Sequence, residues 1–276
     1  MKQKSDAGQP YRLSELRALL DDCRALGLAS ASRDIAGGAL AAIGLADYYA
    51  TVATPLGVAY IAWNAVGLSL ARLAKSDAEF RALAQAELGR AVTPGAPPEW
   101  LADGAQAWLA GDRAAPLKFN LSRLTPFEQA TLLKARDIPF GEVRPYGWIA
   151  REIGHPRAVR AVGTALARNP VPLFIPCHRV VRTDGYLGNY SMGGPENKRV
   201  ILRAEGVDIE RLERLAVKGV RFVGNAADDS YCYPTCAFAR HIDEAHLKLF
   251  HDEASALALG YHACEVCRPP AAKLAS

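Results

Sequence analysis

Five consecutive residues, Pro176 to Val180, most restrict what this chain can fold into. They place Cys177 beside His178, directly after the apolar run Val171–Ile175. Such a run predicts a strand or a buried turn that carries the cysteine into the interior. Because the thiolate is the reactive form of cysteine, a nucleophilic Cys177 needs a base or a cation nearby.

Length and composition describe an ordinary globular chain. Its 276 residues allow two or three domains, and half of them are apolar while 22% are charged. No apolar stretch reaches the roughly 18 residues of a membrane span, and the polar Met1–Pro10 leads into no signal peptide. We therefore expect a cytoplasmic protein. Among its six cysteines, those paired at short spacing are expected to serve metal binding or chemistry rather than disulfides.

Charge is distributed unevenly along the chain. Residues 120–207 hold 13 Lys/Arg against 7 Asp/Glu, a net charge of +6, whereas residues 217–276 hold 6 against 7. The basic middle is a candidate surface for a polyanion. A solvated surface without a partner explains the same excess, so charge alone does not establish nucleic-acid binding.

Local patterns predict a small α+β unit before the cysteine motif. Residues 48–53 and 58–63 read as strands joined by the turn Thr54–Gly57, and residues 76–88 read as a helix. Residues 93–98 read as a loop. The Ala/Leu-rich residues 14–44 predict one or two helices, with Cys23 as a small apolar residue on one of them.

A helix-turn-helix pattern follows a helix whose start is marked by Thr125, Pro126 and Glu128, a capping box. The turn is Gly154-His155-Pro156, and the second helix is expected over about 157–168. Its apolar and basic faces are opposed, and small residues lie between them. The basic face comprises Arg157, Arg160, Thr164 and Arg168. A surface helix with solvated arginines is the alternative reading.

A carboxylate downstream completes a possible catalytic set. Glu205 lies between a predicted helix and Gly206, where it can orient His178, which in turn polarises the Cys177 thiol directly or through water. Adjacent Cys and His side chains do not share a face of a strand. The set therefore needs a turn or a bridging water.

The middle of the chain resembles the active domain of the O6-alkylguanine-DNA alkyltransferases, or methylated-DNA–protein-cysteine methyltransferases. The resemblance is dense over 124–207 and weak back to about 47. It rests on five segments in the same order: Pro139–Val143, Arg160–Gly163, Asn169-Pro170, Pro176–Val180 and the glycine-rich loop through Gly194. It implies a ribonuclease-H-like N-terminal α/β domain and a helical, winged helix-turn-helix-like alkyltransferase domain.

The resemblance also implies roles for individual residues. Cys177 accepts the alkyl group once and irreversibly, His178 is its base through water, Glu205 orients His178, and Asn169 supports the turn. The family binds duplex DNA through the minor groove, flips the damaged guanine and uses no organic cofactor. The residues matching its DNA contacts are Tyr146, Arg157, Arg160, Ala161, Gly163, Tyr190 and Ser191. Met192 is an insertion relative to some members, which could alter tolerance for larger alkyl groups.

The C-terminal segment carries two close cysteine pairs, Cys232/Cys236 and Cys264/Cys267. Four thiolates in two pairs match a tetrahedral zinc site and favour zinc over disulfides in a reducing compartment. Nearby histidines are competing ligands, but four cysteines already complete the shell. These histidines are His241, His246, His251 and His262.

This segment resembles the metal-binding domain of the Ada response protein. In that family the residue matching Cys232 is both a zinc ligand and the acceptor of a methyl group from a DNA phosphotriester. The chain departs from the family at His262, Ala263 and Glu265, and no regulatory helix-turn-helix follows. Its net charge of −1 also speaks against strong phosphate contact. A purely structural zinc module is therefore the alternative to phosphotriester repair.

The sequence as a whole predicts an α+β DNA-repair methyltransferase with one zinc ion. The expected parts are a helical extension (1–45), the ribonuclease-H-like domain (46–119), the alkyltransferase domain (120–207) and the zinc module (217–276). The expected substrate is O6-alkylguanine in double-stranded DNA, with O4-alkylthymine as a further candidate, and a monomer without membrane contact is expected. An Ada-type methylation-switched regulator and a cysteine hydrolase stay open as alternatives.

Overall fold

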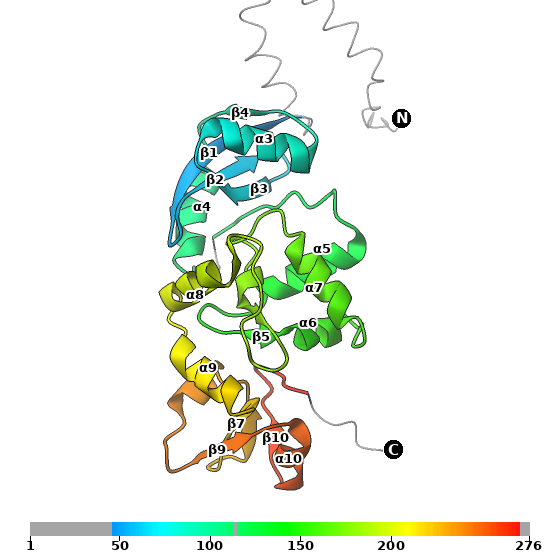
Figure 1. The fold of residues 1–276 in the computed structure, drawn as a ribbon, viewed down its shortest axis with the longest axis vertical. Helices are drawn as coiled ribbons and strands as arrows, with labels where there is room; N and C mark the ends of the chain where they lie inside the picture. Colours follow the sequence, from blue (N-terminus) through cyan, green and yellow to red (C-terminus); the bar gives the residue numbers. More distant parts are fainter. Residues whose placement is uncertain (1–45, 113–114, 271–276) are drawn as a thin grey trace, which may run out of the picture.

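The computed structural model describes residues 46–112 and 115–270, which form three units stacked along one axis (Figure 1). We call them the N-terminal unit (46–112), the middle unit (120–217) and the C-terminal unit (218–270). The helices predicted within 14–44, with Cys23, lie outside the described residues. No helix of the described ranges is long and apolar enough to cross a membrane.

The N-terminal unit is a four-stranded sheet of order β3-β2-β1-β4 with two helices. Its elements are β1 (Asp47–Thr54), β2 (Gly57–Trp63), β3 (Leu68–Leu73), α3 (Asp77–Leu88), β4 (Val92–Pro94) and α4 (Glu99–Leu109). The predicted hairpin is confirmed by antiparallel pairing of β1 with β2. The loop predicted over 93–98 is wrong at its start, because Thr93 and Pro94 pair in parallel with β1.

The middle unit is helical. Its elements are α5 (Pro126–Arg136), β5 (Arg144–Pro145), α6 (Tyr146–Glu152), α7 (Val159–Ala167), β6 (Val180–Val181), α8 (Gly194–Ala204) and α9 (Ile209–Val217). The capping box at Thr125 and Glu128 is confirmed in both directions. Helices α6 and α7 form the predicted pair around Gly154. Arg157 was predicted on the second helix. It lies instead in the turn before α7, which begins at Val159.

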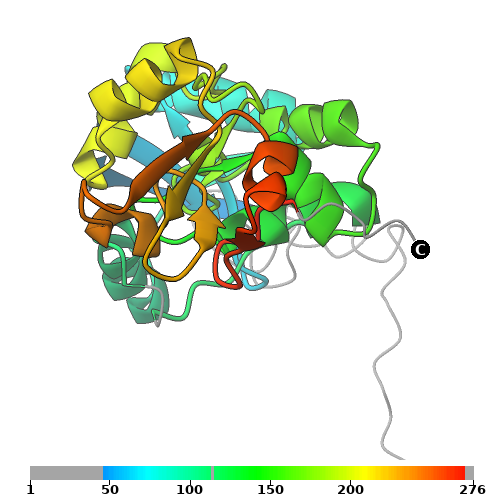
Figure 2. The ribbon, with the colours of Figure 1, turned by 90° about the horizontal axis from the view of Figure 1, so that it is seen from below.

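The C-terminal unit is a second four-stranded sheet, of order β10-β8-β7-β9. Its elements are β7 (Phe222–Asn225), β8 (Ser230–Cys232), β9 (Leu247–Phe250), α10 (Glu253–Ala258) and β10 (His262–Ala263). Figure 2 looks onto this sheet from below, with the middle unit behind it.

The apolar core runs through all three units. One cluster of buried side chains includes Trp63 of β2, Trp148 of α6 and Tyr231 of β8. Since burying apolar surface is the main favourable term in folding, a shared core holds the units in one arrangement. The mixed α+β class predicted from the sequence is confirmed.

Candidate active site and candidate metal centre

Asn169 organises the turn that carries Cys177. Its side-chain amide donates to Ile175 O at 2.8 Å and to Cys177 Sγ at 3.2 Å. Its carbonyl oxygen accepts from the Val171 N–H at 3.0 Å. Within the turn Leu173 has φ +78°, a left-handed conformation that leucine rarely adopts. Asn169, fully buried, therefore clamps both ends of a strained turn.

Cys177 is held as a buried thiol. It is 7% exposed and is the first residue of the 3-10 turn Cys177–Arg179. Of the two predicted conformations, strand and buried turn, the buried turn is confirmed. Burial raises the pKa of Cys177, although hydrogen bonds from Asn169 and Ser191 and the charge of Lys198 act in the opposite direction. The resting cysteine is therefore neutral at pH 7, and its proton must leave during the reaction.

His178 and Glu205 form a buried pair. His178 Nε2 lies 2.8 Å from Glu205 Oε1. Burial raises the pKa of Glu205, but His178 and Arg179 outweigh it and lower the pKa to about 2. The ionised carboxylate only accepts hydrogen bonds, so Nε2 carries the imidazole proton and Nδ1 keeps a lone pair.

The lone pair of His178 Nδ1 is available for a proton. This atom is buried and has no hydrogen-bond partner among the described residues. Burial lowers the pKa of His178, while Glu205 partly offsets that effect. The ring is therefore neutral near pH 7 and can act as a base.

Two buried cations at the site were missed by sequence reasoning. Arg179 donates to Glu205 Oε2 at 2.7 Å and Oε1 at 2.8 Å, and to Ile138 O at 2.8 Å. Its position inside the Pro176–Val180 motif was an available signal. Lys198 of α8 donates to Val180 O and Leu187 O, each at 2.6 Å, and burial lowers its pKa to about 8. No local pattern distinguishes Lys198 from a surface lysine.

The glycine-rich loop closes over the site. The Tyr190 ring meets the His178 ring edge to face, with centroids 5.9 Å apart. Ser191 is exposed. Met192 is buried, and its Sδ accepts a hydrogen bond from the Tyr190 hydroxyl at 3.8 Å. The extra residue therefore helps to fix the position of the tyrosine ring.

The residues matched to DNA contacts lie in two places. Tyr190 and Ser191 belong to the glycine-rich loop, and the others lie on α6, on α7 or in the turn between them. Arg157, Arg160 and Ala161 are exposed, and none of them contacts Cys177. Gly163 is half-buried, and a Cβ there would lie 3.9 Å from the Tyr146 ring. The structure thus brings one group of the predicted residues together in the interior: Asn169, Cys177, His178, Tyr190 and Glu205. It leaves Arg157, Arg160 and Ala161 exposed on or just before α7.

The four C-terminal cysteines converge on one point. The sulfurs of Cys232, Cys236, Cys264 and Cys267 all lie within 4.8 Å of one another, and all four residues are buried. Hydrogen bonds from Cys232 and Cys267 lower the pKa of Cys236, whereas the pKa of Cys232 and that of Cys267 are raised. One sulfur is therefore anionic first, and a bound cation is needed to draw the protons from the others. Four buried sulfurs at this spacing fit a tetrahedral zinc ion, and no histidine joins the group within the described chain.

The C-terminal unit packs on the segment Gly141–Arg144 next to the active site. The Thr235 hydroxyl accepts from the Val143 N–H at 2.9 Å, and the Ala237 N–H donates to Glu142 Oε1 at 3.0 Å. Arg240 donates to Gly141 O, while the Gly141 N–H reaches Glu205 Oε2 at 3.4 Å. A Cβ at Gly141 would lie 2.7 Å from Glu205 O, so only glycine fits.

Comparison with known proteins divides the chain at α9. Residues 126–207 match the family model described as 6-O-methylguanine DNA methyltransferase, DNA binding domain. Residues 213–270 match the model described as metal binding domain of Ada. Together with the converging sulfurs, the second match makes the four cysteines a zinc site.

Individual relatives match to different extents. The constitutive methylated-DNA–protein-cysteine methyltransferase of Bacillus subtilis is 35% identical over 166 residues, which are 58% of this chain and 96% of that protein. The Rattus norvegicus methyltransferase is 44% identical over 94 residues, 34% of this chain and 44% of the rat protein. The chain thus spans less than half of the rat protein. The crystal structure of Mycobacterium tuberculosis OGT in complex with DNA aligns with 32% identity and a TM-score of 0.47, covering 60% of this chain and 99% of that one.

Proposed function

This chain belongs to the methylated-DNA–protein-cysteine methyltransferase family, and we propose that Cys177 takes the alkyl group from O6-alkylguanine in duplex DNA, once per molecule. The observation that carries the proposal is the buried series of Asn169, Cys177, His178 and Glu205. It combines a clamped thiol, a neutral base and an ionised carboxylate in one site.

The proposed transfer begins with the Cys177 proton. The Nδ1 lone pair of His178 receives it through a water molecule, and Glu205 stabilises the imidazolium that forms. The thiolate then attacks the alkyl carbon, and the bond from that carbon to O6 breaks. Its electron pair leaves with the guanine, which takes a proton back. The product is guanine and an S-alkyl cysteine, and the stable thioether explains a single turnover.

The target base has to leave the helix to reach a sulfur that is 7% exposed. We assign Arg160 to the space left in the base stack, and Tyr146 to the phosphate beside the flipped nucleotide. Ala161 and Gly163 keep α7 slim enough for close contact with a minor groove. Arg157, Tyr190 and Ser191 complete the proposed contact set. The ribonuclease-H-like and winged helix-turn-helix descriptions belong to the same proposal.

For the zinc module we favour a structural role over phosphotriester repair. Cys232 is 1% exposed, and the loop that follows it packs on the middle unit through Thr235 and Ala237. A methyl acceptor must expose its sulfur to the donor carbon. Transfer to Cys232 would therefore require the C-terminal unit to open around the four sulfurs.

The two rival functions predict different behaviour. A cysteine hydrolase would regenerate Cys177 and turn over without DNA, and it leaves the exposed arginines around α7 unexplained. An Ada-type regulator would bind one DNA sequence more tightly after methylation. Neither rival accounts for both the clamped neutral thiol and the exposed arginines on and just before α7.

The test is peptide mapping after incubation with duplex DNA that carries O6-methylguanine and methylphosphotriesters. We expect one methyl group on the Cys177 peptide, none on the Cys232 peptide, and none on any peptide of Cys177→Ala. An unmodified wild-type protein, or transfer by Cys177→Ala, would refute the proposal. A stoichiometric methyl group on Cys232 would instead refute the purely structural role of the module.

A further inference from the structure

An open groove joins the helix-turn-helix to the C-terminal unit. It has a volume of about 470 Å³ and is lined by Tyr146, Val159, Arg182, Thr183, Asp184 and Arg221. Tyr146 and Val159 begin α6 and α7, and Arg221 directly precedes β7. The surface proposed to meet DNA therefore continues onto the C-terminal unit, beyond the end of the alkyltransferase match at residue 207.

The surroundings of Gly188 and Gly185 show how closely the residues of the groove approach one another. A Cβ at Gly188 would lie 3.3 Å from Arg182 Cγ and 3.8 Å from the Tyr146 hydroxyl. A Cβ at Gly185 would lie 3.6 Å from Arg221 Nη1. Tyr146, Arg182 and Arg221 thus follow one another along the wall of the groove.

The groove has an excess of positive charge. Its one carboxylate, Asp184, is paired with Arg182, whose side chain is still 60% exposed. Arg221 forms no ion pair within the described part of the chain. Arg157 and Arg160 lie exposed nearby, on and just before α7. A row of arginines with one satisfied carboxylate suits a phosphate backbone.

Arg221 is fixed in place before any ligand arrives. Its backbone N–H donates to Phe250 O at 2.8 Å, and its Nη1 donates to Asp184 O at 2.5 Å. The remaining guanidinium donors have no partner among the described residues. A preorganised arginine loses less conformational entropy when it binds a phosphate than a free surface side chain does.

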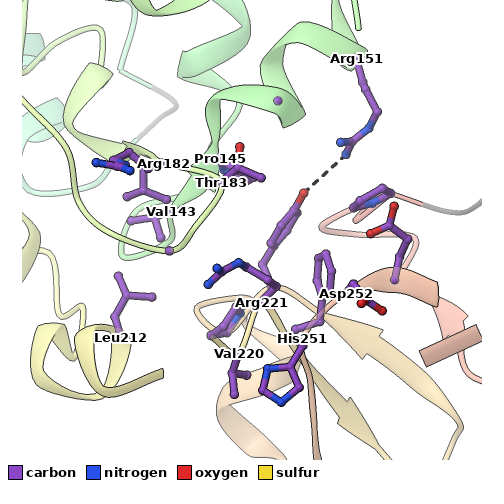
Figure 3. Close-up of a pocket in the computed structure, with 18 residues that line it drawn as sticks. Val143, Pro145, Arg151, Arg182, Thr183, Leu212, Val220, Arg221, His251 and Asp252 are labelled. Atoms are coloured by element: carbon purple, nitrogen blue, oxygen red, sulfur yellow. Dashed lines mark hydrogen bonds between the residues drawn. The ribbon is translucent and has the colours of Figure 1, made fainter. Parts of the chain in front are cut away.

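Acidic residues of the C-terminal unit lie on another side of Arg221. A separate cavity of about 390 Å³ shares Arg182, Thr183 and Arg221 with the groove and is lined further in by Asp252 and Glu253. Figure 3 shows Arg182 and Thr183 on one wall, Asp252 on the other and Arg221 between them. The cavity is also lined by Arg151, so its three arginines and two carboxylates sum to the same +1 as the two arginines and one carboxylate of the groove. The groove is the better place for a phosphate backbone because it is open and continues from Tyr146 and Val159, on the surface proposed to meet DNA.

We propose that Arg221, together with Arg182, binds phosphates of the DNA backbone next to the nucleotide contacted by Tyr146. The inference rests on the proposed function and adds the C-terminal unit to the DNA-binding surface. The net charge of −1 for residues 217–276 predicted no strong phosphate contact by the C-terminal unit. Arg221 is an exception, because it lines the basic groove at the boundary with the middle unit.

The test is the salt dependence of binding to an unmodified DNA duplex, measured by fluorescence anisotropy with wild type, Arg221→Gln, Arg221→Lys and Arg214→Gln. Arg214 is an exposed arginine of α9 that does not line the groove, so it is the matched control. Each phosphate contact adds about 0.9 to the slope of log K against log salt. We expect Arg221→Gln to reduce the slope by about that amount, and Arg221→Lys and Arg214→Gln to keep it.

The outcomes separate the two proposals. A wild-type protein that neither binds DNA nor transfers a methyl group would refute the proposed function itself. Normal transfer by wild type with an unchanged slope in Arg221→Gln would refute only the Arg221 contact. An equal loss in Arg221→Lys and Arg221→Gln would assign the effect to the hydrogen bond with Asp184 O and also overturn the inference. If Arg221→Gln does not fold, Arg182→Gln on the same groove carries the same expectation.

Discussion

Two centres of this protein are built from buried cysteines and differ in what surrounds the sulfur. Cys177 is alone, with an amide donor, a neutral imidazole and distant cations, and burial raises its pKa. The four C-terminal cysteines surround one another within 4.8 Å, and hydrogen bonds from neighbouring thiols lower the pKa of Cys236. A lone buried thiol stays protonated until a base acts. In the cluster the pKa of Cys236 is lowered while the pKa values of Cys232 and Cys267 are raised, so the full set of thiolates forms only around a cation. Both centres therefore use buried cysteine, and the groups around each sulfur determine whether it acts as a nucleophile or as a metal ligand.

The largest expected effect is the loss of transfer in Cys177→Ala. The other described cysteines are grouped with one another in the four-cysteine site, so methyl transfer from O6-methylguanine DNA should fall below detection. Zinc content should stay at about one per chain, because the four-cysteine site is untouched. Mass spectrometry of the intact protein and metal analysis measure both. A methyl group on any other cysteine would break the distinction between the two centres.

The converse variant is Cys264→Ala with Cys267→Ala. We expect complete loss of zinc and unfolding of the C-terminal unit, since structural zinc contributes on the order of 10 kcal/mol to small domains of this kind. Transfer at Cys177 should continue at a reduced rate. Metal analysis, circular dichroism and single-turnover kinetics measure the three effects. Retained zinc would contradict the four-cysteine site.

Replacing the carboxylate tests how the lone thiol is activated. Glu205→Gln keeps the shape but removes the charge that stabilises the imidazolium, so single-turnover transfer should slow about 10²-fold. It also leaves Arg179 buried without its counter-ion, and a loss of about 3 kcal/mol of unfolding free energy is expected. Glu196→Gln at the exposed start of α8 is the matched control. A Glu205→Gln rate equal to wild type would remove His178 and Glu205 from the mechanism.

The pH dependence of transfer follows from the two shifted groups. Burial lowers the pKa of His178 below its ordinary 6.5, so the base stays neutral, and the rate stays constant, until pH falls below that value. The lowered pKa of Glu205, about 2, also stabilises the fold above the ordinary value of 4.5. This contribution is lost as pH falls towards 2. Rates between pH 4 and 8 check the first expectation, and melting temperatures from pH 8 down to about pH 2 check the second. A rate that already declines above pH 6.5 would contradict a neutral His178.

The smallest expected effect concerns the link between the centres. Arg240 holds Gly141 O, and the Gly141 N–H reaches Glu205. Arg240→Gln should therefore slow transfer a few-fold while zinc content is unchanged. His241→Gln, the neighbouring residue without a described contact to Gly141, is the control. Identical rates for wild type and Arg240→Gln would show that the two centres act independently.

Local features were predictable from the sequence and distant pairings were not. The Thr125 capping box and the first hairpin depend on residues a few positions apart, and both predictions hold. Strand β4 was missed because its partner β1 lies across helix α3 in the chain. Arg179 stands inside the Pro176–Val180 motif, but its pairing with Glu205 was not predicted, since the carboxylate comes 26 positions later.

The sequence by itself determined the reactive residues: a cysteine beside a histidine after an apolar run, and two cysteine pairs with the spacing of a zinc site. Capping, periodicity and ligand spacing are short-range properties that a chain carries before it folds. Only the tertiary structure decided the state of those residues. Burial keeps the Cys177 thiol protonated, and His178 and Arg179 hold Glu205 ionised. Packing of the C-terminal unit buries Cys232 among the other three cysteines and brings Arg221 into the same groove as Tyr146. Each of these depends on desolvation or on a partner far along the chain, and both come into being only when distant segments pack together.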